Sequence, residues 1–168
     1  MVTLIEYSEY YKEETIERIA RFFGLHAQFL NDELTMTEKN YIEAENTLKT
    51  WISDDSALYI ILYENEPVGF LRIGYRGPGV AWIEDIYIDE KHRSKGIATE
   101  SILQAEEIVK LNPRYKAISI DVVPRNIEAI NLYYKLGYTD LSIITVRKEF
   151  YESKRDKKIE IFGKDFYY

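Results

Sequence analysis

The amino-acid sequence predicts one α/β domain in which about four helices flank a mixed β-sheet of about seven strands. The chain has 168 residues, which is enough for one domain with a substantial core, and 46% of them are hydrophobic. Hydrophobic periods typical of helices and of strands alternate along the whole sequence. No repeat, linker or low-complexity tract divides it, so a single domain is expected over residues 1–168.

The N-terminal half is predicted to contain a first strand, two helices and a group of three strands. Residues 1–7 are typical of a strand, and apolar residues at helical spacing predict a helix that begins at Glu13 and stops near Gly24. A second helix is expected from about Thr37, with Thr37 and Asn40 as possible caps. Residues that favour β-structure then predict strands over 57–63, 68–75 and 80–88.

The C-terminal half is predicted to alternate helices with strands. One helix is expected from Gly96, and another from Asn126 to Leu136 with Gly137 as its C-terminal stop. Apolar runs predict strands over 117–123, 141–148 and 158–166. The whole order of elements is typical of a mixed sheet within one α/β domain.

The composition excludes several classes of protein. Because the chain has no cysteine, disulfides, thiolate metal sites and a cysteine nucleophile are excluded, and a cytoplasmic location is expected. The net charge of -7 disfavours a nucleic-acid binder, although such a charge also simply keeps a protein soluble. No apolar run approaches the roughly 20 residues that cross a bilayer, so no membrane partner is expected. His26 and His92 lack the spacing of metal ligands, so no metal is expected, and His92 should be solvated.

The strongest chemical signal is the segment Arg93-Ser94-Lys95-Gly96-Ile97-Ala98, which follows a predicted strand and opens a predicted helix. Small side chains at Gly96 and Ala98 let a ligand approach backbone N–H groups closely. The positive end of the helix dipole, with Arg93 and Lys95, favours a bound phosphate. A plain loop before a capped helix would show the same residues. The segment matches neither a Walker loop nor Gly-x-Gly-x-x-Gly, which disfavours a nucleotide-dependent enzyme.

Two segments resemble the GNAT superfamily of N-acetyltransferases. Ile83–Ala98 is similar to the family's coenzyme A-binding segment, in which Arg/Gln-x-x-Gly-x-Gly/Ala follows a hydrophobic strand. Asn126–Tyr138 is similar to the family helix with the pattern Asn-x-x-Ala-x-x-Leu-Tyr-x-x-x-Gly-Phe/Tyr. The resemblance covers residues 57–138, with Ala98 at a position where many members have glycine. The flanking segments agree with the family only in their general layout.

The resemblance implies a mostly antiparallel sheet and an N-acetyltransferase that uses acetyl-coenzyme A (acetyl-CoA) as co-substrate. The backbone of Ile86 and Ile88 would contact the pantetheine arm as an added strand does. Asn126, which also suits a helix cap, would contact the coenzyme. The other residues that the resemblance assigns to coenzyme binding are Arg93, Ser94, Lys95, Gly96, Ile97, Ala98, Thr99 and Tyr133.

The resemblance also implies two catalytic residues. Glu84 matches a glutamate that acts as the base in some members, especially those similar to diamine acetyltransferases. A base is needed because alkylamines are protonated at neutral pH. Asp85, or water alone, is the alternative to Glu84 as the base. Only one of the two carboxylates should face the acetyl group, since successive strand residues face opposite sides. Tyr133 matches the tyrosine that donates a proton to the coenzyme sulfur, whereas Tyr134 points about 100° away. A polar strand residue and a packing tyrosine are the plainer explanations.

The acceptor is expected to be a small cationic amine, such as a polyamine or an aminoglycoside-like compound. In this superfamily the first two helices and the late hairpin usually build the acceptor pocket. Here those segments are rich in acidic and aromatic residues, which suit an ammonium group. Asp85, Phe29 and Asp32 are the predicted substrate-binding residues. The alternatives are an amine on a protein, or a sensor module that binds acetyl-CoA with little turnover. Aromatic residues late in the chain suit a homodimer interface.

Overall fold

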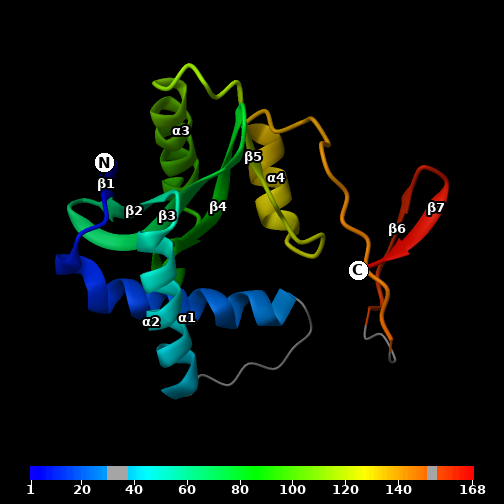
Figure 1. The fold of residues 1–168 in the computed structure, drawn as a ribbon. Coiled ribbons are helices and arrows are strands. Elements are labelled where there is room, and N and C mark those ends of the chain that lie inside the picture. The colour runs from blue at the N-terminus through cyan, green and yellow to red at the C-terminus, as the bar shows by residue number, and fades with distance from the viewer. Residues whose placement is uncertain (30–37, 151–154) are drawn as a thin grey trace.

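The computed structural model describes residues 1–29, 38–150 and 155–168. This part of the chain contains seven strands in two sheets (Figure 1). The larger sheet has the order β1-β2-β3-β4-β5; it is antiparallel from β1 to β4, whereas β4 and β5 are parallel. Its strands are β1 (Val2–Glu6), β2 (Ser56–Tyr63), β3 (Glu66–Gly77), β4 (Val80–Ile88) and β5 (Ala117–Ile120), and the smaller sheet pairs β6 (Lys158–Ile161) with β7 (Lys164–Tyr167). The predicted mixed α/β fold is confirmed.

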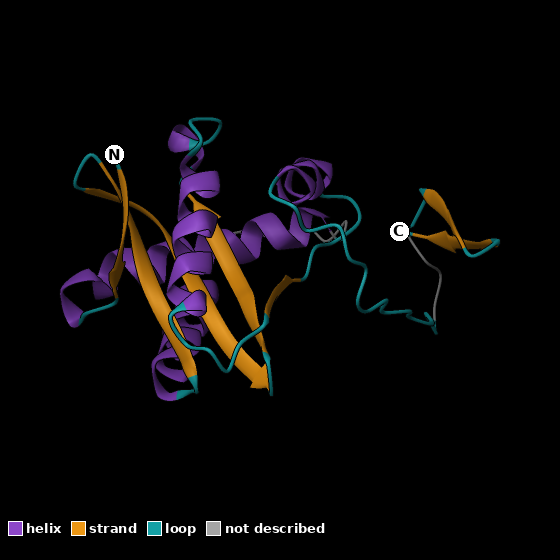
Figure 2. Cartoon of the chain, turned by 90° about the horizontal axis from the view of Figure 1, so that it is seen from above, coloured by secondary structure: helices purple, strands orange, loops and turns teal. Residues whose placement is uncertain are grey.

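Helices cover both faces of the larger sheet (Figures 1 and 2). α1 (Lys12–Phe29) and α2 (Glu38–Ser53) pack on one face around the fully buried Phe70. α3 (Ile97–Lys110) and α4 (Ile127–Lys135) contribute to the core on the other face. Two short 3-10 helices, η1 (Glu9–Tyr11) and η2 (Glu90–His92), precede α1 and α3. None of the helices in the described ranges is long and apolar enough to cross a membrane.

Helix α1 is longer than predicted, because it continues past Gly24 to Phe29. One glycine inside a helix costs only about 1 kcal/mol relative to alanine, whereas burying a phenylalanine contributes about 1.5–3 kcal/mol. Phe22 is buried on the sheet, and the ring of His26 packs on it one helical turn later, so contacts on both sides of Gly24 favour continuation of the helix. Of the two predicted caps of α2, Asn40 lies inside the helix, and Thr37 lies outside the described residues.

Strand β4 carries a β-bulge at Glu84. Arg72 of β3 pairs with Asp85, whereas the next residue, Ile73, pairs with Ile83, so Glu84 is the extra residue. A bulge interrupts the alternation of side chains between the two faces of a sheet. The expectation that Glu84 and Asp85 face opposite sides was based on a regular strand, and it does not apply here.

The C-terminal arm, residues 139–168, differs from its prediction. No strand forms over 141–148, and the strand expected over 158–166 is instead the β6–β7 hairpin, whose turn has φ of 69° at Gly163. A strand needs a neighbour for its backbone hydrogen bonds, and no described strand lies beside 141–148. The arm extends away from the rest of the molecule, called the body below (Figure 2). β5 likewise ends at Ile120, before the predicted end at residue 123.

Candidate active site

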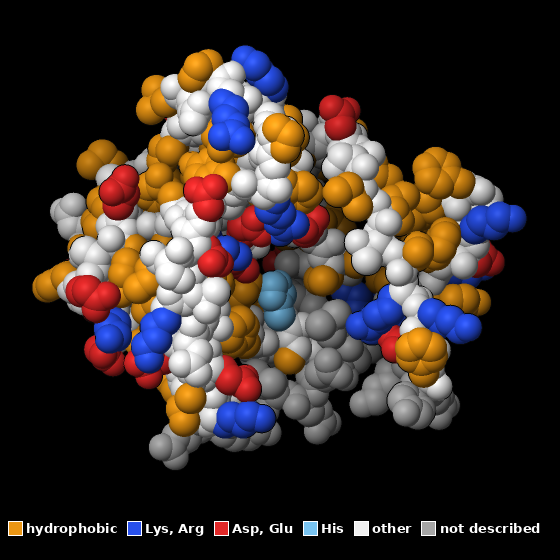
Figure 3. Space-filling view, in the orientation of Figure 1, with side chains coloured by type: hydrophobic (Ala, Val, Ile, Leu, Met, Phe, Trp, Pro, Cys, Tyr) orange, Lys and Arg blue, Asp and Glu red, His pale blue; other side chains and the backbone are white. Residues whose placement is uncertain are grey.

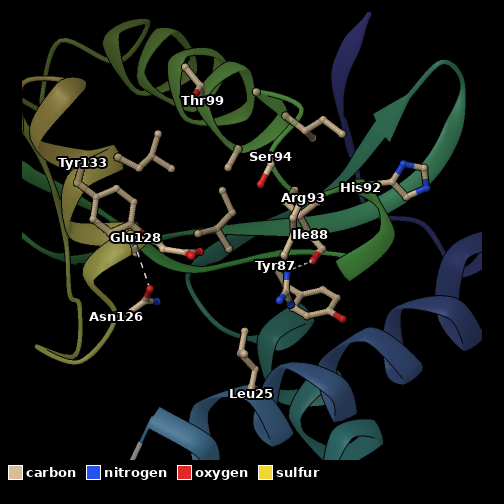
Figure 4. A pocket seen from close by; sticks show the side chains of 16 residues that line it. Leu25, Tyr87, Ile88, His92, Arg93, Ser94, Thr99, Asn126, Glu128 and Tyr133 are labelled. Atoms are coloured by element: carbon tan, nitrogen blue, oxygen red, sulfur yellow. Dashed lines mark hydrogen bonds between the residues drawn. The ribbon is translucent and has the colours of Figure 1, made fainter.

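A cavity of about 310 Å³ opens where β4 and β5 separate. Their pairing ends with Ile83 opposite Ile120, so, of the described strands, only β3 lies beside residues 84–88. The cavity lies along this free edge, with the starts of α3 and α4 on one side and Leu25 of α1 on the other (Figure 4). Ten residues predicted to bind the coenzyme line it: Ile86, Ile88, Arg93, Ser94, Gly96, Ile97, Ala98, Thr99, Asn126 and Tyr133.

The turn before α3 presents a run of free backbone donors to this cavity. Within the described part of the chain, none of the backbone N–H groups from Ser94 to Thr99 donates a hydrogen bond. Positive φ angles of 60° at Ser94 and 78° at Gly96 shape the turn, and the second explains why a glycine suits that position. Six free N–H groups at the positive end of a helix dipole form a good site for a phosphate.

The basic residues of this turn have separate environments. Arg93 lines the cavity, and its Nε donates to the carbonyl oxygen of Ile88 at 3.2 Å. Lys95 is the predicted coenzyme residue that does not line it; its ammonium lies 5.9 Å from the ring centre of Tyr63. His92 was expected to be solvated, but it lines the cavity, and its buried Nδ1 has no partner among the described residues.

Helix α4 places Tyr133 in the wall of the cavity. The helix starts at Asn126, whose Oδ1 accepts a hydrogen bond from the N–H of Ala129 at 3.2 Å, so the capping role expected for Asn126 is present. Tyr133 is only 9% exposed, and burial raises the pKa of its phenol to about 12. The hydroxyl is therefore neutral at physiological pH, and no described residue hydrogen-bonds to it. Tyr134 is 68% exposed and does not line the cavity.

Glu84 and Asp85 belong to a charged cluster beside the cavity, although neither lines it. Arg76 binds both carboxylate oxygens of Glu84, with Nε 2.7 Å from Oε1, and also pairs with Asp121. Arg72 lies 2.8 Å from Asp85 Oδ2 and 3.9 Å from Glu84 Oε2, so one guanidinium reaches both carboxylates. Burial raises the pKa of Asp85, and the charge of Arg72 opposes that shift. Acidic and basic side chains gather around a hollow on one face (Figure 3).

Six cavity residues were not predicted from the sequence: Leu25, Tyr87, His92, Glu128, Ala129 and Leu132. Ala129 and Leu132 occupy fixed positions of the α4 pattern, so the motif itself contained that signal. Leu25 carried none, because only the packing of α1 against the sheet brings it to the cavity. Of the predicted substrate residues, Asp32 lies outside the described residues, as does the side chain of Phe29. Within the described ranges, no group of three His, Cys, Asp or Glu could hold a metal ion.

The sequence of the body matches a known family. Residues 14–138 fit the model of the acetyltransferase (GNAT) family. The chain belongs to this family. It is therefore an acetyltransferase of the GNAT type.

Relatives and solved structures agree with this assignment. A streptothricin acetyltransferase from Escherichia coli is 30% identical over 101 residues, which is 60% of this chain and 55% of that protein, so the match spans about half of the relative. A spermine/spermidine N(1)-acetyltransferase from Bacillus subtilis is 24% identical over 134 residues, which is 76% of this chain and 85% of that protein. The PaiA N-acetyltransferase of Thermoplasma acidophilum, solved with coenzyme A, has the same fold at a TM-score of 0.64 and 17% identity. The match covers 82% of this chain and 89% of that protein.

Proposed function

We propose that this acetyltransferase acetylates a primary amine of a small cationic molecule, such as a polyamine or an aminoglycoside-like compound. The observation that carries the proposal is the acidic pair Glu84–Asp85, which is partly buried beside a cavity that suits acetyl-CoA. Arg76 and Arg72 pair with these two carboxylates, but Asp121 is a third carboxylate of the cluster, so the cluster keeps a net charge of -1 that attracts an ammonium group. The names of the two relatives, which refer to streptothricin and to spermine and spermidine, support the same class of acceptor.

The cavity suggests how acetyl-CoA would bind. Its phosphates would accept hydrogen bonds from the free N–H groups between Ser94 and Thr99. The pantetheine arm would lie along residues 86–88, whose outer edge is not paired with any strand that the structure describes. The thioester would then lie near Tyr133, which is on the opposite wall.

Tyr133 would act as the acid. The departing thiolate needs a proton, and a buried phenol with a pKa of about 12 keeps its proton until a base forms next to it. Its hydroxyl has no competing acceptor among the described residues. These properties support the role that the sequence resemblance implied.

Glu84, the base implied by the resemblance, has a less simple position. Both of its oxygens accept hydrogen bonds from Arg76, so neither can take a proton from an amine unless Arg76 moves. Its side chain is only 8% exposed. We therefore propose that Glu84 supplies negative charge for the ammonium, and that it acts as the base only if Arg76 is displaced by the substrate.

The test is release of free coenzyme A thiol from acetyl-CoA, with a panel of polyamines, aminoglycosides, amino acids and short peptides. Tyr133→Phe should lower kcat by roughly 100-fold with little change in acetyl-CoA affinity, because only the proton donor is lost. Tyr134→Phe is the matched control and should behave as wild type, since Tyr134 is exposed and outside the cavity.

Turnover with peptides alone would favour a protein substrate. Tight acetyl-CoA binding without turnover would favour a sensor.

We also propose that two copies pair through the C-terminal arm. Large apolar side chains of the arm are exposed to solvent: Leu141, Ile143, Val146, Phe150, Phe162 and Tyr167. An isolated two-stranded hairpin is only marginally stable in water, so the arm gains from a partner surface. Light scattering should show a dimer, and Phe150→Asp combined with Val146→Asp should shift it to a monomer. A wild-type monomer at every concentration would refute the pairing.

A further inference from the structure

Helix α1 lies along β4 in a regular register. Arg18 Nη2 is 3.1 Å from Asp89 Oδ2, and one helical turn later the ring of Phe22 meets that of Tyr87 edge-on, with centroids 6.4 Å apart. Residues four apart in a helix are separated by about 6 Å, and residues two apart in a strand by about 6.6 Å. The two spacings match, so each fourth residue of α1 meets each second residue of β4. The next residues in this register are His26 and Asp85.

His26 has the properties of an accessible imidazole held at one orientation. Its ring contacts Phe22 with centroids 4.2 Å apart, which fixes it against the sheet. His26 is nevertheless exposed to solvent. No described residue forms a hydrogen bond with either of its ring nitrogens. The preceding residue, Leu25, lines the cavity. Asp85 is close enough for its charge to act on the imidazole.

We propose that His26 is the general base that takes the proton of the acceptor amine, and that Asp85 is its positioning residue. The proposal rests on the proposed function. It follows from the α1–β4 register, the free ring nitrogens, and the fact that Arg76 already binds both oxygens of Glu84. Neither family segment contains His26, so the sequence motifs give no signal for it.

The proton balance of the reaction is complete with these groups. The ammonium gives one proton to His26, and the amine nitrogen attacks the thioester carbonyl carbon. As the C–S bond breaks, the thiolate takes the hydroxyl proton of Tyr133. The new amide nitrogen loses its second proton, which restores the Tyr133 phenol. His26 then releases its proton to solvent, so each turnover yields one amide, one free thiol and one proton.

Electrostatics keep His26 in the form that a base needs. Partial loss of hydration against Phe22 and the sheet lowers the pKa of His26 below the ordinary 6.5, although the residue stays accessible to solvent, and the charge of Asp85 partly opposes this shift. The imidazole is therefore neutral at pH 7. The other charged groups around this point are Glu84 and Arg72, which share the cluster with Asp85, while the neighbouring turn of α1 presents Phe22. Activity should accordingly rise as pH increases through a value below 6.5 and then level off.

The experiment is a pH profile of kcat/KM for the amine at saturating acetyl-CoA. Wild type should show the plateau, because the base removes the ammonium proton. His26→Ala should lose roughly 100-fold at pH 7 and rise about tenfold per pH unit, because only free amine then reacts. Added imidazole should restore activity to His26→Ala. His92→Ala, the matched histidine variant, should weaken acetyl-CoA binding without imidazole rescue.

The variant Asp85→Asn tests whether Asp85 acts on the His26 imidazole or only supports the local structure. Removing its charge lowers the pKa of His26 further, so the rise in activity should move to lower pH. His26→Ala with a wild-type profile and no imidazole rescue would overturn the proposal while leaving acetyl transfer intact. Absence of turnover with every amine in the wild type would instead overturn the proposed function, and with it the role of His26. Acetyl-CoA binding by His26→Ala and Asp85→Asn establishes that both are folded, and a urea unfolding curve does so for His92→Ala.

Discussion

The body and the C-terminal arm contain similar residues but use them differently. In the body, Phe70 is fully buried and contacts the rings of Phe22, Trp51 and Tyr87. In the arm, Phe150 is 86% exposed, and no described arm residue is buried. The difference shows that an apolar side chain stabilises a fold only where other elements cover it. The body should therefore be the cooperative unit, with the arm free to serve an interface.

The largest expected difference comes from the two phenylalanines. Phe70→Ala removes a ring from the core and should lower the free energy of unfolding by about 3–5 kcal/mol. At protein concentrations low enough for the chain to be a monomer, Phe150→Ala removes an exposed ring and should change it by less than about 0.5 kcal/mol. Urea unfolding of both variants measures this. A large loss in the monomer would show that the arm packs against the body, whereas a loss only at concentrations where the dimer forms would support the proposed pairing.

A second pair tests how closely β3 is packed against the charged cluster. A Cβ at Gly74 would collide with the Glu84 side chain, whereas one at Gly77 would meet nothing within 4 Å. Gly74→Ala should cost about 1–3 kcal/mol and lower kcat/KM, because it displaces Glu84. Gly77→Ala should be nearly neutral in both. Equal stability and activity of the two variants would contradict the position of Glu84.

The smallest expected difference concerns two glycines with positive φ, Gly137 at 94° in the body and Gly163 at 69° in the arm. Alanine in the left-handed region costs roughly 1–2 kcal/mol. Gly137→Ala should therefore lower global stability by about that amount, measured by urea unfolding. Gly163→Ala should leave it unchanged, because the hairpin is not part of the body's core. A loss in Gly163→Ala would place the hairpin inside the cooperative unit.

The same contrast explains what could be predicted from the sequence. β4 has its predicted bounds, 80–88, because β-forming residues are bracketed by a Gly-Pro-Gly break and a charged turn. The lining of the cavity that we propose for acetyl-CoA consists mostly of residues singled out from the sequence, since they lie in two local motifs. The strand expected over 141–148 has the right residues, but a strand also needs a neighbour, which sequence periodicity does not report.

The charged cluster was the least predictable part of the site. The bulge at Glu84 and the two arginines that bind it depend on strand register, which alternation alone does not give. His26 lies near Asp85 only because α1 and β4 share a spacing in three dimensions. Gly24 also misled the prediction, because tertiary packing outweighs the small helical cost of one glycine.

The central claim is that the cavity between β4 and β5 delivers the acetyl group of acetyl-CoA to a small amine. Mass spectrometry of the amines, after incubation with the protein and acetyl-CoA, tests it most directly. We predict that a polyamine or an aminoglycoside gains one acetyl group, and that Tyr133→Phe strongly slows this gain while Tyr134→Phe does not. Acetylated peptides with unmodified small amines, or no acetylated product at all, would contradict the claim.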